Sequence, residues 1–167
     1  IYQYEGGGYA ALSGVSVALI DGHKGQLTAE AVSKAVRKAE GSLGHYPDGT
    51  LVCVENTANR GGGTCYNQDT LDAIASTARK HGCAIHMDGA RIFNAAVKMN
   101  TPIDRMLRDF DSVSICLSKG LGAPVGSLLV GSEQFIAKAS RWRKLFGGGM
   151  RQSGCLAACG LYALEHN

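Results

Sequence analysis

Several features that would place this chain in a specialised class of protein are scarce or missing. It has only 3 prolines and 1 tryptophan among 167 residues, and it shows neither a disordered linker nor an internal repeat. No apolar run approaches the roughly 20 residues that a membrane-spanning helix needs. The formal net charge of +3 is too small to indicate a nucleic-acid-binding protein. We therefore predict neither a membrane partner nor a nucleic-acid partner.

The cysteines also lack the spacing of a metal or redox site. None of the 6 forms a CxxC pair, and Cys83 and His86 have no second pair of ligands. Most of them lie in apolar runs, where a free cysteine behaves as a small hydrophobic residue. We predict no metal, reduced thiols and an intracellular location, in the cytoplasm unless a missing N-terminus directs the protein to an organelle.

What the sequence does contain is enough apolar material for one domain. Hydrophobic residues make up 45% of the chain and glycine supplies 23 residues, which indicates a globular domain unusually rich in glycine. The chain starts at Ile1 rather than Met and stops at Asn167, inside a predicted helix. We therefore expect a fragment of a longer protein.

Short apolar segments alternate with segments of helical periodicity along the chain. Strands are predicted at residues 15–20, 51–54, 83–87, 112–117 and 125–130. Helices are predicted from Thr28 to Gly41, after Asn67 or Asp69, through Phe93 and Val97, from Pro102, after Ser132 and from Gln152. The alternation predicts an α/β fold, with a mostly parallel sheet between two layers of helices.

Polar residues follow three of the predicted strands, at the edge where ligands bind in open α/β sheets. Glu55 follows one strand, Asp88 and Arg91 follow the next, and Lys119 follows a third. A lysine between two apolar strands is costly unless it is paired, solvated or chemically used. Partial desolvation would make Lys119 an available amine, as Schiff-base chemistry requires.

Each of these residues also has an ordinary structural interpretation. Lys119 could be a surface lysine in a hairpin, Asp88 could cap the following helix, and Arg91 could pair with Asp88. Together they match what pyridoxal phosphate (PLP) needs, namely a lysine for its carbonyl group and a carboxylate beside its ring nitrogen. The combination therefore favours a PLP site over three unrelated surface residues.

Three segments carry a resemblance to a known family. They are His86–Asn94 (HMDGARIFN), Cys116–Ser127 (CLSKGLGAPVGS) and Gly147–Gln152 (GGGMRQ). In this order and separation they resemble the L-threonine aldolases of the low-specificity type, which are beta-eliminating lyases among the fold-type I PLP enzymes. The resemblance runs over essentially the whole chain. It implies an aspartate-aminotransferase-like large domain that cleaves L-threonine or L-allo-threonine to glycine and acetaldehyde.

The resemblance also implies a role for four residues near the reacting atoms. Lys119 would form the Schiff base with PLP, and Asp88 would pair with the ring nitrogen. Arg91 would lie near the cofactor's phenolic oxygen and bind the substrate carboxylate. His45 would lie near the substrate hydroxyl and act in catalysis, although a histidine in a polar loop could equally be merely exposed.

Two basic residues would hold the cofactor phosphate. Arg151 follows three glycines and precedes a predicted helix, where anions bind well. Lys144 ends the basic cluster Arg141–Lys144 and could instead belong to an exposed helix face. The resemblance implies that both could act across a subunit interface, in a homo-oligomer built as a dimer of dimers that processes a small β-hydroxy amino acid.

The chain departs from the family in ways that leave its loops and substrate preference open. Ala58 follows Glu55-Asn56-Thr57 where the family commonly has histidine, and Asp48-Gly49 replaces an Arg-Thr pair of some members. The family's phosphate-cradling segment and ring-stacking histidine would precede Ile1, and its small C-terminal domain would follow Asn167. Residues 1–167 would thus be the central part of the PLP-binding large domain, inactive when isolated.

Two alternatives remain at this point. Lys119 and Asp88 would serve equally in another beta-eliminating lyase of the same fold type. A non-catalytic nucleotide-binding domain could use the glycines of Gly120–Gly126, although their spacing misses the dinucleotide pattern. The products distinguish the first alternative from a threonine aldolase, because a lyase of that kind releases pyruvate and ammonia instead of glycine and an aldehyde.

Overall fold

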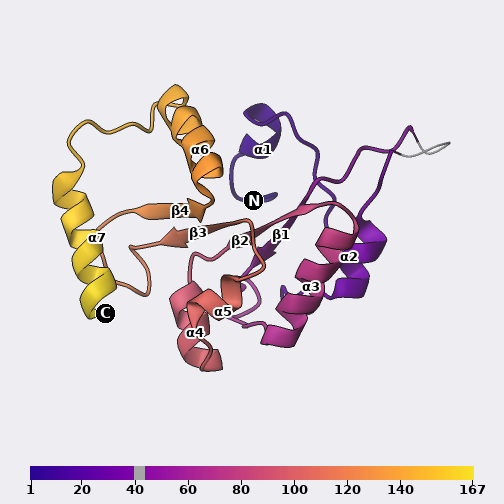
Figure 1. The fold of residues 1–167 in the computed structure, drawn as a ribbon, viewed down its shortest axis with the longest axis horizontal. Helices are drawn as coiled ribbons and strands as arrows, with labels where there is room; N and C mark the ends of the chain where they lie inside the picture. The colour runs from indigo at the N-terminus through magenta and orange to yellow at the C-terminus, as the bar shows by residue number, and fades with distance from the viewer. Residues whose placement is uncertain (40–43) are drawn as a thin grey trace.

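A mixed four-stranded sheet lies at the centre of the molecule in the computed structural model, which describes residues 1–39 and 44–167 (Figure 1). The strands lie in the order β1 (Leu51–Glu55), β2 (Ala84–Asp88), β3 (Ser112–Cys116) and β4 (Ser127–Gly131). Strands β1, β2 and β3 are parallel, and β4 runs antiparallel to β3. The predicted α/β class with a mostly parallel sheet is confirmed.

Seven helices accompany the sheet in the described part of the chain. They are α1 (Gly8–Ala11), α2 (Ala29–Ala35), α3 (Gln68–Lys80), α4 (Ile92–Met99), α5 (Ile103–Leu107), α6 (Glu133–Leu145) and α7 (Gly154–His166). None of these described helices has the length and apolar character of a membrane span.

Polar side chains begin three of the helices as the sequence predicts. Thr28, Asn67 and Ser132 each accept a hydrogen bond from a backbone N–H in the first turn of α2, α3 and α6. Such caps satisfy N–H groups that have no partner within the helix. Helix α2 ends at Ala35, and Gly41, the predicted end, lies outside the described residues.

Helical crossovers set the direction of the first three strands. Helix α3 connects β1 to β2, and α4 and α5 connect β2 to β3. Parallel strands require such crossovers, because a tight hairpin reverses the chain. The carboxyl ends of β1, β2 and β3 therefore meet at one edge of the sheet.

The core lies between the sheet and the helices α2 to α5, which Figure 1 shows gathered on one side of it. Val52 and Val54 of β1 and Ile85 and Met87 of β2 point into this core. Opposite them α3 buries one face, made of Leu71, Ile74, Ala75 and Ala78. Their spacing of three and four residues is the period of a helix, which is why one stripe of α3 can be buried.

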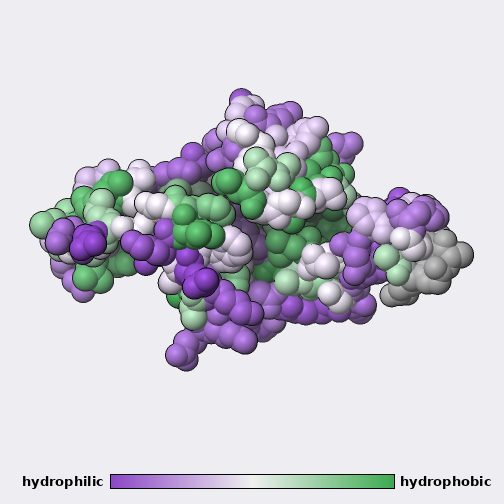
Figure 2. Space-filling view, turned by 90° about the horizontal axis from the view of Figure 1, so that it is seen from above, coloured by the Kyte–Doolittle hydropathy of each residue, from purple (hydrophilic) through white to green (hydrophobic). Residues whose placement is uncertain are grey.

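The other side of the sheet is only partly covered within the described residues. Leu51 is 55% exposed and Cys53 is also exposed, so β1 alternates between open and buried positions. The sequence predicts a strand covered on both faces, and this part of the prediction is wrong for β1 here. Figure 2 looks onto this side and shows hydrophobic surface in its middle.

One predicted strand does not form. Residues 15–20 have no strand assignment, and Val15 and Leu19 are 49% and 61% exposed. An apolar run becomes a strand only when a neighbouring strand accepts its backbone hydrogen bonds. The described part of the chain provides no such partner for this segment.

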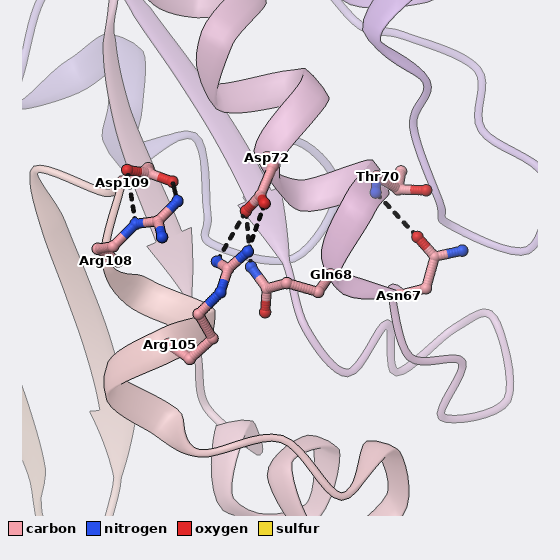
Figure 3. Close-up of polar contacts among 7 residues, drawn as sticks. All are labelled: Asn67, Gln68, Thr70, Asp72, Arg105, Arg108 and Asp109. Carbon is pink, nitrogen blue, oxygen red and sulfur yellow. Dashed lines mark hydrogen bonds and ion pairs between the residues drawn. The ribbon is translucent and has the colours of Figure 1, made fainter.

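Charged pairs join the outer surface of α3 to α5 and to the loop before β3. Figure 3 shows the pair between α3 and α5. Arg105 donates two hydrogen bonds to the carboxylate of Asp72, at 3.0 and 2.5 Å. These hydrogen bonds hold the pKa of Asp72 at about 2, below its ordinary value of 3.8. Arg79 of α3 likewise donates to both oxygens of Asp111, at 2.7 and 2.8 Å. The two ion pairs hold α3 against α5 and against the loop that leads into β3.

Truncation of Ile74 tests the position of α3 on the sheet. Ile74 is fully buried, so I74A should lower the free energy of unfolding by about 2–5 kcal/mol through lost burial and a cavity. Urea titration followed by circular dichroism measures this change. The control is S76A, two residues along the same helix and exposed, which should change stability by less than about 0.5 kcal/mol. Equal effects of I74A and S76A on stability would contradict the burial of Ile74 between α3 and the sheet.

Neutralising Asp72 should change how stability depends on pH. Because its pKa is depressed in the folded state, ionised Asp72 stabilises the fold above pH 3.8, and this contribution disappears as the pH falls toward about 2. D72N should therefore be less stable than the wild type at neutral pH, and the gap should narrow below 3.8. Urea midpoints measured across this range test the trend. D104N removes the charge of an exposed acid of α5. Its stability should differ much less from that of the wild type.

Candidate active site

Two carboxylates end neighbouring strands at the shared edge of the sheet. Glu55 of β1 and Asp88 of β2 are register partners, and Asp88 is also paired with Ser114 of β3. Asp88 accepts a hydrogen bond from the backbone N–H of Ala90 through Oδ1, at 3.1 Å. Asp88 therefore begins a tight turn directly beyond β2.

Glycine at position 89 lets this turn lie flat on β3. The N–H of Gly89 donates to the carbonyl of Ser114 at 2.8 Å. A Cβ at position 89 would lie 3.0 Å from Cγ1 of Val113 and 3.1 Å from the Ser114 carbonyl oxygen, which is tighter than side chains normally allow. The close approach fixes Asp88 relative to the strand that leads to Lys119.

Arg91 occupies the N-cap position of α4, three residues after Asp88. Its side chain is half-buried and provides no capping hydrogen bond to the helix. The helix itself is anchored by the buried residues Ile92 and Ala95, and the N–H of Ile92 donates to the carbonyl of Gly89 at 2.9 Å. Asp88 and Arg91 are thus held on one rigid element.

Lys119 lies in the connection between β3 and β4, beyond the same edge of the sheet. Its carbonyl accepts a hydrogen bond from the N–H of Gly122 at 2.9 Å, which makes the turn tight. The side chain is exposed in the described chain, so the desolvation expected from its apolar neighbours in sequence is not present here. The turn that carries Lys119 nevertheless lies beyond the carboxyl end of β3, at the edge of the sheet that carries Asp88.

A small hydrophobic cluster holds the lysine turn in place. Leu117, Leu121 and Ala123 are buried together with Ala163 of α7, and Phe93 of α4 packs against them. Asn167, at the end of α7, donates to the carbonyl of Leu121 at 2.8 Å. The turn that carries Lys119 is therefore fixed between α4 and α7.

Sequence reasoning missed one contact of this turn. The three atoms nearest to a Cβ at Gly120 would all belong to the side chain of Asn94. The available signal was that Asn94 follows Arg91 by one helical turn inside the first of the three motifs. The contact joins the element of Asp88 and Arg91 directly to the lysine turn.

Lys144 and Arg151 lie on either side of the glycine turn that ends α6. Gly147 has a φ of +80°, and the N–H of Gly148 donates to the carbonyl of Arg143 at 2.8 Å, which closes the helix with a left-handed glycine. A Cβ on Gly149 would lie 3.2 Å from Cδ of Lys144. Gly149, two residues before Arg151, therefore packs against the aliphatic part of the Lys144 side chain.

These two basic residues are not brought to the strand edge within this chain. Both are exposed. Lys144 lies in the last turn of α6, and Figure 1 shows the loop from α6 to α7 extending away from the sheet. Among the described residues, neither side chain makes a hydrogen bond or ion pair. The structure therefore leaves Lys144 and Arg151 facing outward.

His45 lies at the opposite end of the sheet. It precedes β1, and the carbonyl of Thr50 accepts a hydrogen bond from Ala84 at the amino end of β2. The imidazole contacts the ring of Tyr46 at a tilt of 45°, with ring centroids 4.6 Å apart. A strand the length of β1 spans roughly 15 Å, so His45 is not brought to Asp88 or Lys119 of the same chain.

His86 lies on the open side of the sheet, two residues before Asp88. Its Nδ1 lies 2.8 Å from Oγ of Ser112 on β3. Partial burial lowers the pKa of His86, and the negative charge of Asp88 opposes this change. The hydrogen bond with Ser112 therefore holds the imidazole of His86 against the neighbouring strand.

The chemistry of the side chains at the strand edge fits PLP. Asp88 offers a carboxylate on a fixed turn, Arg91 offers a guanidinium one helical turn away, and Lys119 offers a primary amine from the adjoining turn. A carboxylate can pair with a protonated pyridine nitrogen, and an amine can bond to an aldehyde carbon. These three residues are the ones that could hold the cofactor's ring and its reactive carbon.

Comparison with known families and relatives agrees with this chemistry. The model of the beta-eliminating lyase family matches residues 1–167, so the chain belongs to that family. It is 48% identical over its whole length to a probable low-specificity L-threonine aldolase of Arabidopsis thaliana, and covers 47% of that protein. It is 42% identical over 99% of its length to the low specificity L-threonine aldolase of Escherichia coli K12, and covers 48% of that protein. The family predicted from the three motifs is confirmed.

Solved structures support the fold. The chain superimposes on a threonine aldolase of Leishmania major with a TM-score of 0.78 and 21% identity, covering 96% of the chain and 46% of that protein. A PLP-bound C–S lyase of Staphylococcus hominis matches more loosely, with a TM-score of 0.55, 15% identity and coverage of 87% and 36%. The chain spans about half the length of the relatives it matches by sequence.

Proposed function

We propose that the whole protein is a PLP-dependent carbon–carbon lyase that cleaves L-threonine and L-allo-threonine to glycine and acetaldehyde. The observation that carries this proposal is the meeting of the Asp88–Arg91 element with the Lys119 turn at one strand edge. The sequence identity to low-specificity L-threonine aldolases supports the choice of substrate.

In this proposal each residue at the strand edge has one task. Lys119 holds the cofactor through its amine, and Asp88 keeps the ring nitrogen protonated by pairing with it. PLP, when bound, supplies an electron sink for the pair left on the substrate Cα when the Cα–Cβ bond breaks. Arg91 binds the substrate carboxylate and so orients the bond to be broken.

Lys144 and Arg151 would bind the cofactor phosphate from a second copy of the chain. Their exposure and their lack of a described partner within the chain support this assignment. We propose a homo-oligomer on this basis, with a dimer of dimers as its form. A role for His45 at the substrate hydroxyl stays a prediction. Because His45 does not reach the strand edge of its own chain, it would have to act at the strand edge of another copy.

The extent of the domain and the location of the protein are part of the same proposal. Residues 1–167 would form the central part of the PLP-binding large domain, with an upstream segment and a small C-terminal domain completing the protein. The coverage of less than half of the matched relatives supports this division. An intracellular location would suit the 6 cysteines, all of which are free in the structure.

Covalent trapping of the cofactor tests the proposal. The full-length protein, purified with PLP and treated with borohydride, should carry the reduced cofactor on Lys119, as peptide mass spectrometry reads out. Incubation with L-threonine should yield glycine and acetaldehyde. Pyruvate and ammonia would instead indicate another beta-eliminating lyase, and a missing label would favour a non-catalytic nucleotide-binding domain.

Replacing Asp88 should impair turnover more than cofactor binding. D88A removes the carboxylate that stabilises the charged ring, and losing such a group typically costs about 100-fold or more in kcat. Steady-state kinetics of the full-length enzyme measure this loss, and fluorescence titration with PLP measures binding. S114A provides a matched control, because it keeps the backbone carbonyl that receives Gly89 and should retain activity. An unchanged kcat in D88A would refute the assigned role.

A further inference from the structure

We propose that His86 tunes Asp88: its neutral form lets Asp88 pair with the charged ring nitrogen of PLP, and its protonated form opposes that pairing. His86 is a positioning residue in this scheme, because it acts on the cofactor through Asp88. The inference rests on the proposed pairing of Asp88 with PLP, and it adds a dependence of that pairing on pH.

His86 and Asp88 lie on the same face of β2. The alternate residues Ile85 and Met87 are fully buried in the core, so His86 and Asp88 point to the open side of the sheet. Two residues of a strand span roughly 7 Å, and no other side chain of β2 lies between them on this face. The imidazole therefore neighbours the carboxylate that begins the turn beyond β2.

The adjacent strand fixes the imidazole in this position. Ser112 of β3 is the register partner of His86 and is itself buried. Its Oγ lies 2.8 Å from Nδ1 of His86. Ser114 is in the same way the register partner of Asp88. The hydrogen bond at Nδ1 holds the ring along β3, so His86 and Asp88 occupy successive rows of the sheet.

The groups around the imidazole leave Asp88 as the charge that acts on it. The neighbour of His86 on β1 is Cys53, and burial and the charge of Asp88 raise the pKa of this thiol, which stays neutral. Glu55, further along β1, accepts a hydrogen bond from the N–H of Asn59 at 3.1 Å. Burial lowers the pKa of His86 below its ordinary value of 6.5, and the charge of Asp88 opposes this change. His86 is therefore neutral at neutral pH and gains its charge in mildly acidic solution.

A charge on His86 changes what Asp88 can bind. Beside a neutral imidazole, the carboxylate of Asp88 is available to a protonated ring nitrogen. Beside an imidazolium, two positive charges compete for the same carboxylate and repel each other. At a separation of roughly 7 Å in a partly solvated site, this repulsion corresponds to about a tenfold change in affinity. Acidification therefore weakens the binding of PLP through His86.

Removing the titration of His86 tests the inference in the full-length protein. H86N places an amide where Nδ1 lies, so it keeps a hydrogen-bonding partner for Ser112 but has no group that titrates. The matched control is H81Q. His81 also contacts a serine, with its Nε2 2.9 Å from Oγ of Ser33, but it precedes the amino end of β2, away from Asp88. PLP affinity is measured by fluorescence titration between about pH 8 and about pH 5.

We expect the affinity of the wild type to fall about tenfold more than that of H86N as the pH is lowered through this range. The affinities of the two proteins should agree at its upper end, and H81Q should follow the wild type throughout. Titration of the PLP phosphate and of Lys119 is common to all three proteins and cancels in the comparison. Parallel curves for the wild type and H86N would overturn the inference, because a purely structural role of His86 would change affinity equally at every pH.

If H86N fails to fold, hydrogen exchange at the imidazole carbon between the two nitrogens decides the question in the wild type. Mass spectrometry of this exchange reports the protonation of each histidine. Because coupling between two sites is reciprocal, PLP should lower the proton affinity of His86 about tenfold more than an analogue with carbon in place of the ring nitrogen. The analogue covers the same site without the ring charge. His81 should respond to neither ligand, and equal values for His86 with both ligands would reject the role.

Failure of this inference and failure of the proposed function are distinguishable. A wild-type protein that carries no PLP on Lys119 after borohydride treatment would overturn both. A labelled wild type whose affinity curve runs parallel to that of H86N would overturn this inference alone.

Discussion

The parallel pairing of β1, β2 and β3 sets the positions of the other elements and of the candidate site. Because helices return the chain after β1 and β2, each of the three strands ends at the same edge. Residues separated by dozens of positions in the chain, such as Glu55, Asp88 and Lys119, are thereby gathered in one region. The hydrophobic contact of α3 with the sheet stabilises this pairing, and the clamps at Asp72 and Asp111 hold the helix in register.

Close packing at this edge of the sheet fixes how the Asp88 turn and the Lys119 turn lie. Gly89 allows the Asp88 turn to lie on β3, and Gly120 allows the lysine turn to lie on α4. At Gly89 the missing Cβ lets two backbone segments approach closely, and at Gly120 it leaves room for the side chain of Asn94. Helix α7 completes the support through Ala163 and Asn167. At this edge of the sheet, glycine therefore serves to allow close packing rather than to make the chain flexible.

Most of the local structure could be predicted from the sequence, because it depends on neighbouring residues. Thr28, Asn67 and Ser132 begin helices through hydrogen bonds within a single turn, and the motif around His86–Asn94 identified the family. The segment at residues 15–20 was wrongly predicted as a strand, because its apolar composition says nothing about whether a partner strand is present. The open side of β1 was missed for the same reason, since burial is decided by elements elsewhere in the protein.

The α/β class, the family and the candidate residues could all be derived from the sequence, because periodicity, capping and motif order are properties of the linear chain. Which of these candidate residues lie near one another depends on the folded chain. It brings Asp88, Arg91 and the Lys119 turn together, leaves His45 at the opposite end of the sheet, and turns Lys144 and Arg151 outward. It also revealed the contact of Asn94 with Gly120, which joins two segments whose proximity depends on how α4 packs. Distances between segments are set by packing of the whole chain, and no local pattern encodes them.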